Sequence, residues 1–266
     1  MSCTIPKHFH FIWIGPQIPE RFQEFYAGWQ SKHPQFKFTL WGEDEILQEP
    51  ELVSALRKIR SVYETETGVL SIKRISIATI TDIIRYYIMY KHGGIYADID
   101  MECIKPIDDL HGECEEACRF LFAGEMVGSP GTVKVFASNN NFIIAPPNHK
   151  FFQDVFDSAV DRIVYICQFF KDNGYDDTHA ENGKYYTNCK NWETNPASVC
   201  GPWWINEKIP AQPEGTYTIC PMHWFNSKAK VEALLQFYGG RRIYARHDAN
   251  NMNGNNGMSS WVLPKV

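Results

Sequence analysis

The sequence predicts an α/β fold built on a parallel sheet, and two segments near the N-terminus carry that prediction. An apolar strand, HFHFIWIG at residues 8–15, is followed by a proline-bounded turn and an amphipathic helix around residues 22–30. A second strand is expected at FKFTLW, residues 36–41, where apolar residues alternate before acidic residues that lead toward a helix. Strand, helix and strand in this order open a parallel α/β sheet.

The clearest helix is predicted over residues 75–92, where apolar residues recur at three- and four-residue spacing. Gly93-Gly94 predicts its end, because glycine adopts the left-handed conformation without steric penalty. The following IYADIDM, residues 95–101, is expected to form a short strand. Alternation along that strand would point Asp98 and Asp100 to the same side, about 7 Å apart.

The rest of the chain is expected to belong to the same domain, residues 1–266. Residues 50–70 show polar helical patterns, and NNNFIIAPPNHKFF predicts a strand, a proline turn and a helix that begins near His149. A polar, Asn-rich insertion occupies residues 171–199, a length that usually marks a functional loop. An Asn- and Gly-rich closing segment, residues 247–266, completes the chain.

Composition narrows the function classes. The 266 residues carry a formal charge of −5 and a pI near 6, which argues against a nucleic-acid or anionic-membrane binder. No signal peptide and no transmembrane segment are recognised, so a soluble, cytoplasmic protein is expected, with a bacterial, viral or host-delivered origin open. The eight cysteines include no C-x-x-C pair, which favours reduced thiols over a zinc site.

Asp98-Ile99-Asp100 is the candidate for chemistry. Two carboxylates at a strand end are commonly just solvated. The functional alternative is a divalent metal site, because Mg²⁺ and Mn²⁺ take oxygen ligands and use one or two carboxylates beside substrate phosphates and water. Asp82 and Arg85 precede the pair on one face of the predicted helix, where they form either part of the site or an ordinary surface ion pair.

This pattern resembles the DXD-motif sugar transferases of the GT-A fold. The likeness is closest to the group of fungal initiating mannosyltransferases and bacterial capsular sugar transferases, and more distant to the large clostridial glucosylating toxins. It spans roughly residues 4–263 and is weakest over 107–135 and 171–199. The residues that match the family's motif, in order, are Asp82, Arg85, Gly93, Gly94, Tyr96, Asp98 and Asp100.

The resemblance implies a GT-A, Rossmann-like α/β fold: a mostly parallel central sheet flanked by helices, with helical and loop excursions on the acceptor side. It implies Mn²⁺ or Mg²⁺ as cofactor, with Asp100 as direct ligand and Asp98 between the ribose and the metal or sugar. The implied catalytic residues are Asp82, Arg85, Asp98, Asp100 and Trp261. The implied donor-binding residues are Ile12, Trp13, Asp82, Arg85, Tyr96, Asp98, Asn141 and Trp261.

The remaining metal ligands are left with two alternatives. Toxin-like members imply Asn256 and Ser259, beside Trp261 at the departing diphosphate, and this set is favoured here. Mannosyltransferase-like members imply a histidine, for which His247 is the candidate. The alternative without a function is that this segment is a frayed, glycine-rich tail. CGPWW, residues 200–204, resembles the family's Gly-Pro turn, and its two tryptophans contact either the acceptor or the core.

The function expected from the resemblance is metal-dependent, retaining transfer of a hexose or N-acetylhexosamine from a nucleotide-diphosphate sugar. A UDP-sugar is favoured and GDP-mannose is open. The acceptor is a hydroxyl on a glycan, lipid or protein, and no residue is named as a covalent nucleophile. The alternatives are a catalytically silent nucleotide-sugar binding module, which would normally have a damaged D-x-D or arginine, and a metal-dependent phosphohydrolase, which would need a denser set of ligands.

Overall fold

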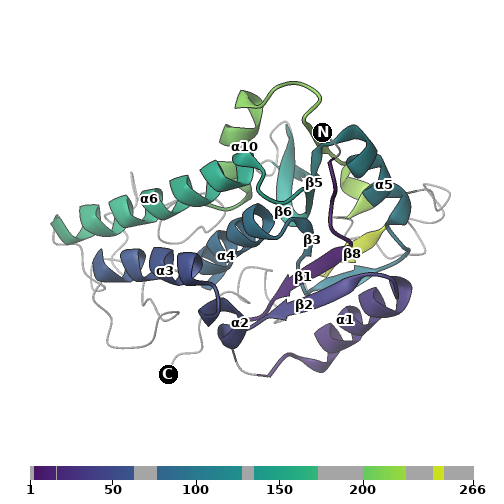
Figure 1. Ribbon diagram of the computed structural model, residues 1–266, viewed down its shortest axis with the longest axis horizontal. Coiled ribbons are helices and arrows are strands. Elements are labelled where there is room, and N and C mark those ends of the chain that lie inside the picture. Colours follow the sequence, from purple (N-terminus) through teal and green to yellow (C-terminus); the bar gives the residue numbers. More distant parts are fainter. Residues whose placement is uncertain are drawn as a thin grey trace.

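The structure is a computed structural model that describes residues 3–15, 17–62, 77–127, 135–172, 200–225 and 242–248. A six-stranded sheet with strand order β2-β1-β3-β6-β5-β7 lies at its centre, and β4 pairs with β8 in a separate two-stranded sheet (Figure 1). The strands are β1 (His8–Ile12), β2 (Lys37–Trp41), β3 (Gly94–Ala97), β4 (Met101–Cys103), β5 (Phe120–Val127), β6 (Val135–Ala145), β7 (Tyr217–Ile219) and β8 (Ala245–His247).

The central sheet is mostly parallel, as predicted. Strand β1 runs parallel to β2 and to β3, and β7 runs parallel to β5. Strand β6 alone is reversed, because it pairs antiparallel with both β3 and β5. The carboxyl ends of β1, β2 and β3 therefore meet at one edge of the sheet.

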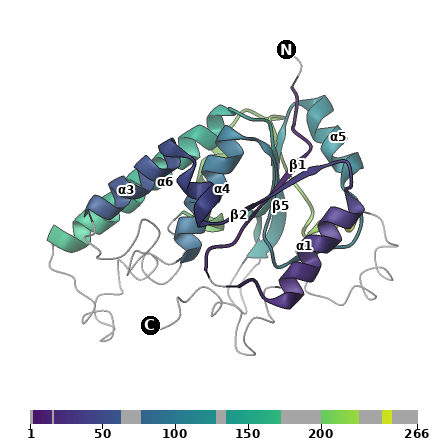
Figure 2. The ribbon, with the colours of Figure 1, turned by 60° about the horizontal axis from the view of Figure 1, so that its bottom comes forward.

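Helices cover both faces of this sheet. In Figures 1 and 2, α3, α4 and α6 lie on one side, while α1 and α5 lie on the other. No helix in the described part of the chain combines the length and apolar character needed to cross a bilayer. The helices are α1 (Glu20–Lys32), α2 (Glu43–Leu47), α3 (Pro50–Val62), α4 (Ile77–Lys91), α5 (Asp108–Ala117), α6 (Lys150–Asp172) and α10 (Pro202–Lys208), with 3₁₀ turns at η1 (Ile209–Ala211) and η2 (Met222–Trp224).

Two hydrophobic cores follow from the alternation of side chains along the strands. Phe9 and Phe11 of β1 point into the core beneath α1 and α5, whereas Ile12 joins the core beneath α3, α4 and α6. Strand β3 divides in the same way, with Ile95 on the first face and Tyr96 on the second. The helices predicted around residues 22–30, over 75–92 and from His149 correspond to α1, α4 and α6.

The glycine pair ends α4 as predicted, with φ of 60° at Gly93 and 84° at Gly94. Close packing also requires these glycines. A Cβ on Gly93 would lie 2.4 Å from the Pro147 nitrogen, and one on Gly94 would lie 2.5 Å from the His8 carbonyl oxygen. The pair therefore lets α4 turn directly into β3 while β3 lies close beside β1.

The predicted continuous strand over residues 95–101 is wrong. Strand β3 ends at Ala97, and the chain then turns: the Met101 amide donates to the Asp98 carbonyl over 3.1 Å. The physical reason is a change of partner, since β3 pairs within the central sheet, whereas β4 leaves it to pair with β8. The two aspartates therefore lie around a turn at the sheet edge, not on one strand face.

Replacing Gly94 with alanine should destabilise the fold by about 3 kcal/mol, because alanine is strained at positive φ and its Cβ would overlap backbone. Urea unfolding of the purified chain measures this change. Gly28→Ala is the matched control, because Gly28 lies within α1 and a Cβ added there would meet nothing within 4 Å. That variant should be stabilised by about 0.5–1 kcal/mol. Equal stability of the two variants would contradict the close approach at β3.

Candidate metal centre

The candidate site lies where β1 and β3 end side by side. His10 is level with Tyr96 in the parallel register. Ile12 ends β1 two residues later, and Asp98 follows Ala97, the last residue of β3. Clefts outside the carboxyl ends of such strands are the usual ligand sites of open α/β sheets. The Asp98 amide donates to the Asn141 carbonyl over 2.8 Å, which attaches the start of the D-x-D turn to β6.

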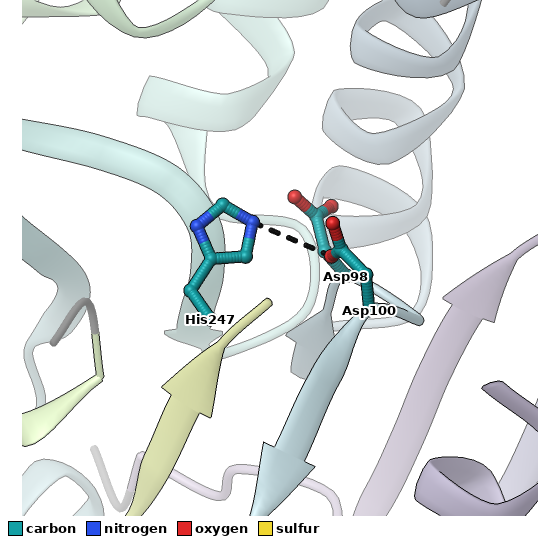
Figure 3. Close-up of side chains that lie close together, drawn as sticks. All are labelled: Asp98, Asp100 and His247. Carbon is teal, nitrogen blue, oxygen red and sulfur yellow. Dashed lines mark ion pairs between the residues drawn. The ribbon is translucent and has the colours of Figure 1, made fainter. Parts of the chain in front are cut away.

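Three side chains with metal-ligating atoms meet at this edge: Asp98, Asp100 and His247 (Figure 3). One ligand atom from each lies within 4.8 Å of the other two, and His247 Nε2 is 3.4 Å from Asp100 Oδ1. Donor atoms on a single six-coordinate cation lie about 3–4 Å apart, given bond lengths near 2.1 Å. The cluster therefore fits a divalent cation after small side-chain movements. Within the described ranges it is the single group of three such side chains.

Strand β8 brings His247 to the aspartates from the far end of the sequence. It pairs antiparallel with β4, which places His247 opposite Met101, the residue after Asp100. Asn141 Nδ2 lies 3.3 Å from His247 Nδ1 and fixes the orientation of the ring. Burial alone would lower the pKa of His247, but the neighbouring carboxylates, Asp100 foremost, raise it overall. The ring thus sits in a negative environment of the kind that attracts a cation.

Arg85 and Tyr96 both bind one carboxylate oxygen of Asp98. Arg85 Nη2 donates to Asp98 Oδ1 over 2.9 Å, and the Tyr96 hydroxyl donates to the same oxygen over 2.7 Å. The guanidinium carbon of Arg85 also lies 4.4 Å from the centre of the Tyr96 ring. Burial raises the pKa of Asp98, and Arg85 opposes that shift. Both donors leave the other carboxylate oxygen of Asp98 for a ligand.

Asp82 and Arg85 are buried, with exposed fractions of 6% and 3%, so the alternative of a surface ion pair is wrong. Arg85 Nη1 lies 3.3 Å from Asp82 Oδ1 and donates to the Asn140 carbonyl over 2.7 Å. Asn140 Nδ2 in turn donates to Asp82 over 2.8 Å. Burial raises the pKa of Asp82 to about 6 despite these contacts. The direct sugar contacts expected of this pair stay a prediction.

The other expected donor-site residues have mixed positions. Ile12 and Tyr96 are buried, with exposed fractions of 5% and 1%, whereas Trp13 is partly buried and packs toward Phe22. Trp204 is a core residue against Tyr86, so the core alternative holds for it. The side chain of Trp203 lies outside the described residues, as do Asn256, Ser259, Trp261 and residues 173–199 of the insertion.

Sequence reasoning missed Asn140, whose side chain joins Asp82 to the Tyr86 hydroxyl 2.9 Å away. A signal was present, because asparagine is depleted in strands and three in a row precede the apolar part of β6. Asn139 and Asn141 also lie within this polar stretch. Asn139 donates to Glu125 over 2.5 Å, and its side-chain oxygen accepts from the Asn141 amide over 3.0 Å.

Residues 19–116 match the family described as the glycosyltransferase sugar-binding region containing the DXD motif. That span includes Asp82, Arg85 and the D-x-D turn. Residues 19–116 therefore resemble the DXD-containing region of glycosyltransferases, and the chain has a fold of the GT-A type. This region extends from the start of α1 to the end of α5, so it contains both aspartates of the metal centre but not His247.

Relatives of this glycosyltransferase region include two proteins of Schizosaccharomyces pombe. Inositol phosphoceramide mannosyltransferase 3 is 31% identical over 109 residues, covering 41% of this chain and 28% of the relative. Inositol phosphoceramide mannosyltransferase 1 is 27% identical over 150 residues, covering 55% of this chain and 40% of the relative. The chain thus spans less than half the length of these curated relatives.

A solved structure supports the fold of the DXD glycosyltransferase region. The UDP-bound glycosyltransferase domain from the YGT toxin superposes with a TM-score of 0.53. The superposition covers 82% of this chain and 79% of that domain, at 11% identity. At this identity the likeness concerns the fold alone.

The raised pKa of Asp82 predicts a pH-dependent stability. The pKa of Asp82 is about 6 in the folded protein and about 3.9 in the unfolded chain, so the folded state binds more protons between these values. The free energy of unfolding therefore rises as the pH falls from 6 towards 3.9, and this stabilisation is lost as the pH rises through 6. Its cost at pH 7.5 is about 3 kcal/mol. The free energy of unfolding of Asp82→Asn, minus that of the unchanged protein, should therefore be larger at pH 7.5 than at pH 4 by about that amount.

Denaturant unfolding of both proteins across this pH range measures the difference. A variant-to-parent difference that stays constant with pH would contradict the raised pKa. Asp161→Asn is the control, because Asp161 is exposed and its ion pair with Lys58 lies on the surface.

Proposed function

We propose that this protein is a metal-dependent, retaining glycosyltransferase. It moves a hexose or N-acetylhexosamine from a nucleotide-diphosphate sugar to a hydroxyl on a glycan, lipid or protein. The observation that carries the proposal is the meeting of Asp98, Asp100 and His247 at the edge where β1 and β3 end. The DXD-containing family match and the mannosyltransferase relatives support the reaction class.

The arrangement suits a charged donor. Asp98 and Asp100 are the proposed ligands of Mn²⁺ or Mg²⁺, with His247 as a third, and Asn256 and Ser259 remain the alternative from the closing segment. When bound, the cation would neutralise the donor's diphosphate and stabilise the charge that develops as it departs. Without a cation, the carboxylates would repel a diphosphate, so donor binding should depend on the metal.

The chain's own residues position the two partners. Arg85 and Tyr96 fix one oxygen of Asp98, which leaves its other oxygen to meet the ribose or the metal. Ile12 ends β1 and Trp13 follows it, and β1 runs parallel to β3, which leads into the D-x-D turn. These two residues are the proposed walls for the nucleoside. Asp82, Arg85 and Asn141 are proposed to orient hydroxyls of the transferred sugar, since such hydrogen bonds discriminate strongly between substrates.

A UDP-sugar is favoured as the donor, and the UDP bound to the toxin domain of the same fold supports this choice. The mannosyltransferase relatives keep GDP-mannose as the second candidate. For the acceptor, the insertion at residues 171–199 and Trp203 are the proposed contacts. Trp261 is proposed to lie beside the departing diphosphate.

Two other functions remain as outcomes of the test. A silent binding module would bind a nucleotide sugar without turnover, although the D-x-D and Arg85 that transfer requires are intact. A phosphohydrolase would need more ligands than the one Asp-Asp-His group found among the described residues.

A donor panel separates these functions. Purified protein with Mn²⁺ is incubated with UDP-glucose, UDP-N-acetylglucosamine, UDP-galactose or GDP-mannose, and nucleotide release is measured. One donor should be cleaved preferentially even with water as acceptor. EDTA should stop release, and added Mn²⁺ or Mg²⁺ should restore it, because the diphosphate needs the cation. Full turnover in excess EDTA would refute the metal role, and binding without turnover of any donor would favour the silent module.

Asp100→Asn should lower nucleotide release by about 100-fold or more, because an amide is a poor ligand for a hard cation and removes one charge from the site. The variant should remain folded, with metal-dependent donor binding lost in calorimetry. Asp161→Asn is the matched control on the exposed face of α6 and should keep full activity. Near-normal turnover by the Asp100 variant would sink the assignment.

A further inference from the structure

The position of His247 raises a structural problem. Strands β4 and β8 have three residues each, and such a short two-stranded sheet is marginally stable by itself. His247 is the last residue of β8, where pairing is weakest. Its distance of 3.4 Å from Asp100 therefore needs support from contacts outside the strand pair.

Asp248, the residue after His247, supplies such contacts. Its amide donates to the Asp100 carbonyl over 3.0 Å, which attaches the backbone to the D-x-D turn. Its carboxylate Oδ2 lies 2.5 Å from Arg21 Nη2. Arg21 belongs to the first turn of α1, and its guanidinium carbon lies 5.5 Å from the centre of the Phe25 ring. The Asp248 side chain thus joins α1 to the end of β8.

The burial of this ion pair is unequal. The side chain of Asp248 is 5% exposed, whereas that of Arg21 is 44% exposed. If Arg21 is removed, the buried carboxylate of Asp248 loses the counter-charge that Arg21 supplies, which is unfavourable. The charge is relieved most easily if the segment moves into water, and His247 would then move with it. If Asp248 loses its charge as well, this reason to move disappears.

Two other ion pairs hold the same segment but differ in burial. Arg246 pairs with Glu102 across β4 and β8, and Arg242 pairs with Glu113 of α5. Both members of the Arg242 pair are exposed, with side-chain fractions of 42% for Arg242 and 49% for Glu113. Breaking this pair leaves no buried charge, because both side chains are already in contact with water. Exposed ion pairs also contribute little to stability.

We propose that Arg21 and Asp248 are positioning residues of the metal centre, which hold His247 against Asp100 through a partly buried ion pair between α1 and the end of β8. Neither residue contacts the cation; both act through His247. The proposal deepens the proposed function and rests on it for the metal that His247 would bind.

The test uses the full chain and Mn²⁺ alone, with affinity measured from the electron paramagnetic resonance of free Mn²⁺. Arg21→Ala should weaken Mn²⁺ binding about 10-fold or more, approaching the loss caused by His247→Ala. Arg21→Lys keeps the charge and should retain most of the affinity. Arg21→Ala combined with Asp248→Asn removes the buried carboxylate together with the cation that faces it, and should recover affinity to within about 3-fold of the parent. Arg242→Ala is the matched control and should bind Mn²⁺ like the parent.

Thermal unfolding accompanies each measurement, because a merely structural role would lower the melting temperature without the pattern of rescue. Arg21→Ala with parental Mn²⁺ affinity, or a double variant no better than Arg21→Ala, would overturn the proposal. If the parent itself binds no Mn²⁺, the proposed function fails instead. The ion pair is then decided by hydrogen exchange over residues 243–248, which Arg21→Ala should accelerate and Arg242→Ala should not.

Discussion

The rest of the site depends on the contacts of one buried group, the guanidinium of Arg85. It comes from α4, and it contacts Asp98 after β3 and the Asn140 carbonyl on β6. A buried cation is tolerated only where charges and hydrogen bonds compensate it, so these three elements must keep one relative arrangement. The D-x-D turn begins at the residue that Arg85 holds, and its position follows from that contact.

The charge balance around Arg85 explains why the site suits a cation. Arg85 pairs with Asp82 and Asp98, whereas Asp100 lies beside His247. Three carboxylates therefore face one guanidinium and one imidazole, and a negative charge remains when all three are ionised, even with His247 protonated. Burial raises the pKa of Asp82 and of Asp98 because the single guanidinium does not compensate both. A divalent cation beside Asp98 and Asp100 would supply the missing positive charge and stabilise both as carboxylates.

The three proposed ligands are held in different ways. Asp98 and Asp100 lie on a turn fixed between the central sheet and β4, with a backbone bond to β6 and the side-chain contacts of Arg85. His247 is held by a three-residue strand, by the Asn141 side chain and by the contacts of Asp248. Local openings are expected where few contacts hold a segment. The histidine is therefore the ligand whose position the protein can change most easily.

The sequence by itself determined the elements and their order. Hydrophobic periodicity gave β1, α1, β2, α4 and α6, the Gly-Gly pair gave the end of α4, and the spacing from Asp82 to Asp100 gave the motif, because these signals are local. Tertiary structure alone decided that the D-x-D forms a turn, since the exchange of partners from β6 to β8 involves residues about 150 positions away. It also decided the burial of Asp82 and Arg85, the role of Asn140, and the approach of His247 and Asp248. These features depend on which charged and polar side chains are buried next to one another, and the spacing of residues along the chain does not determine this.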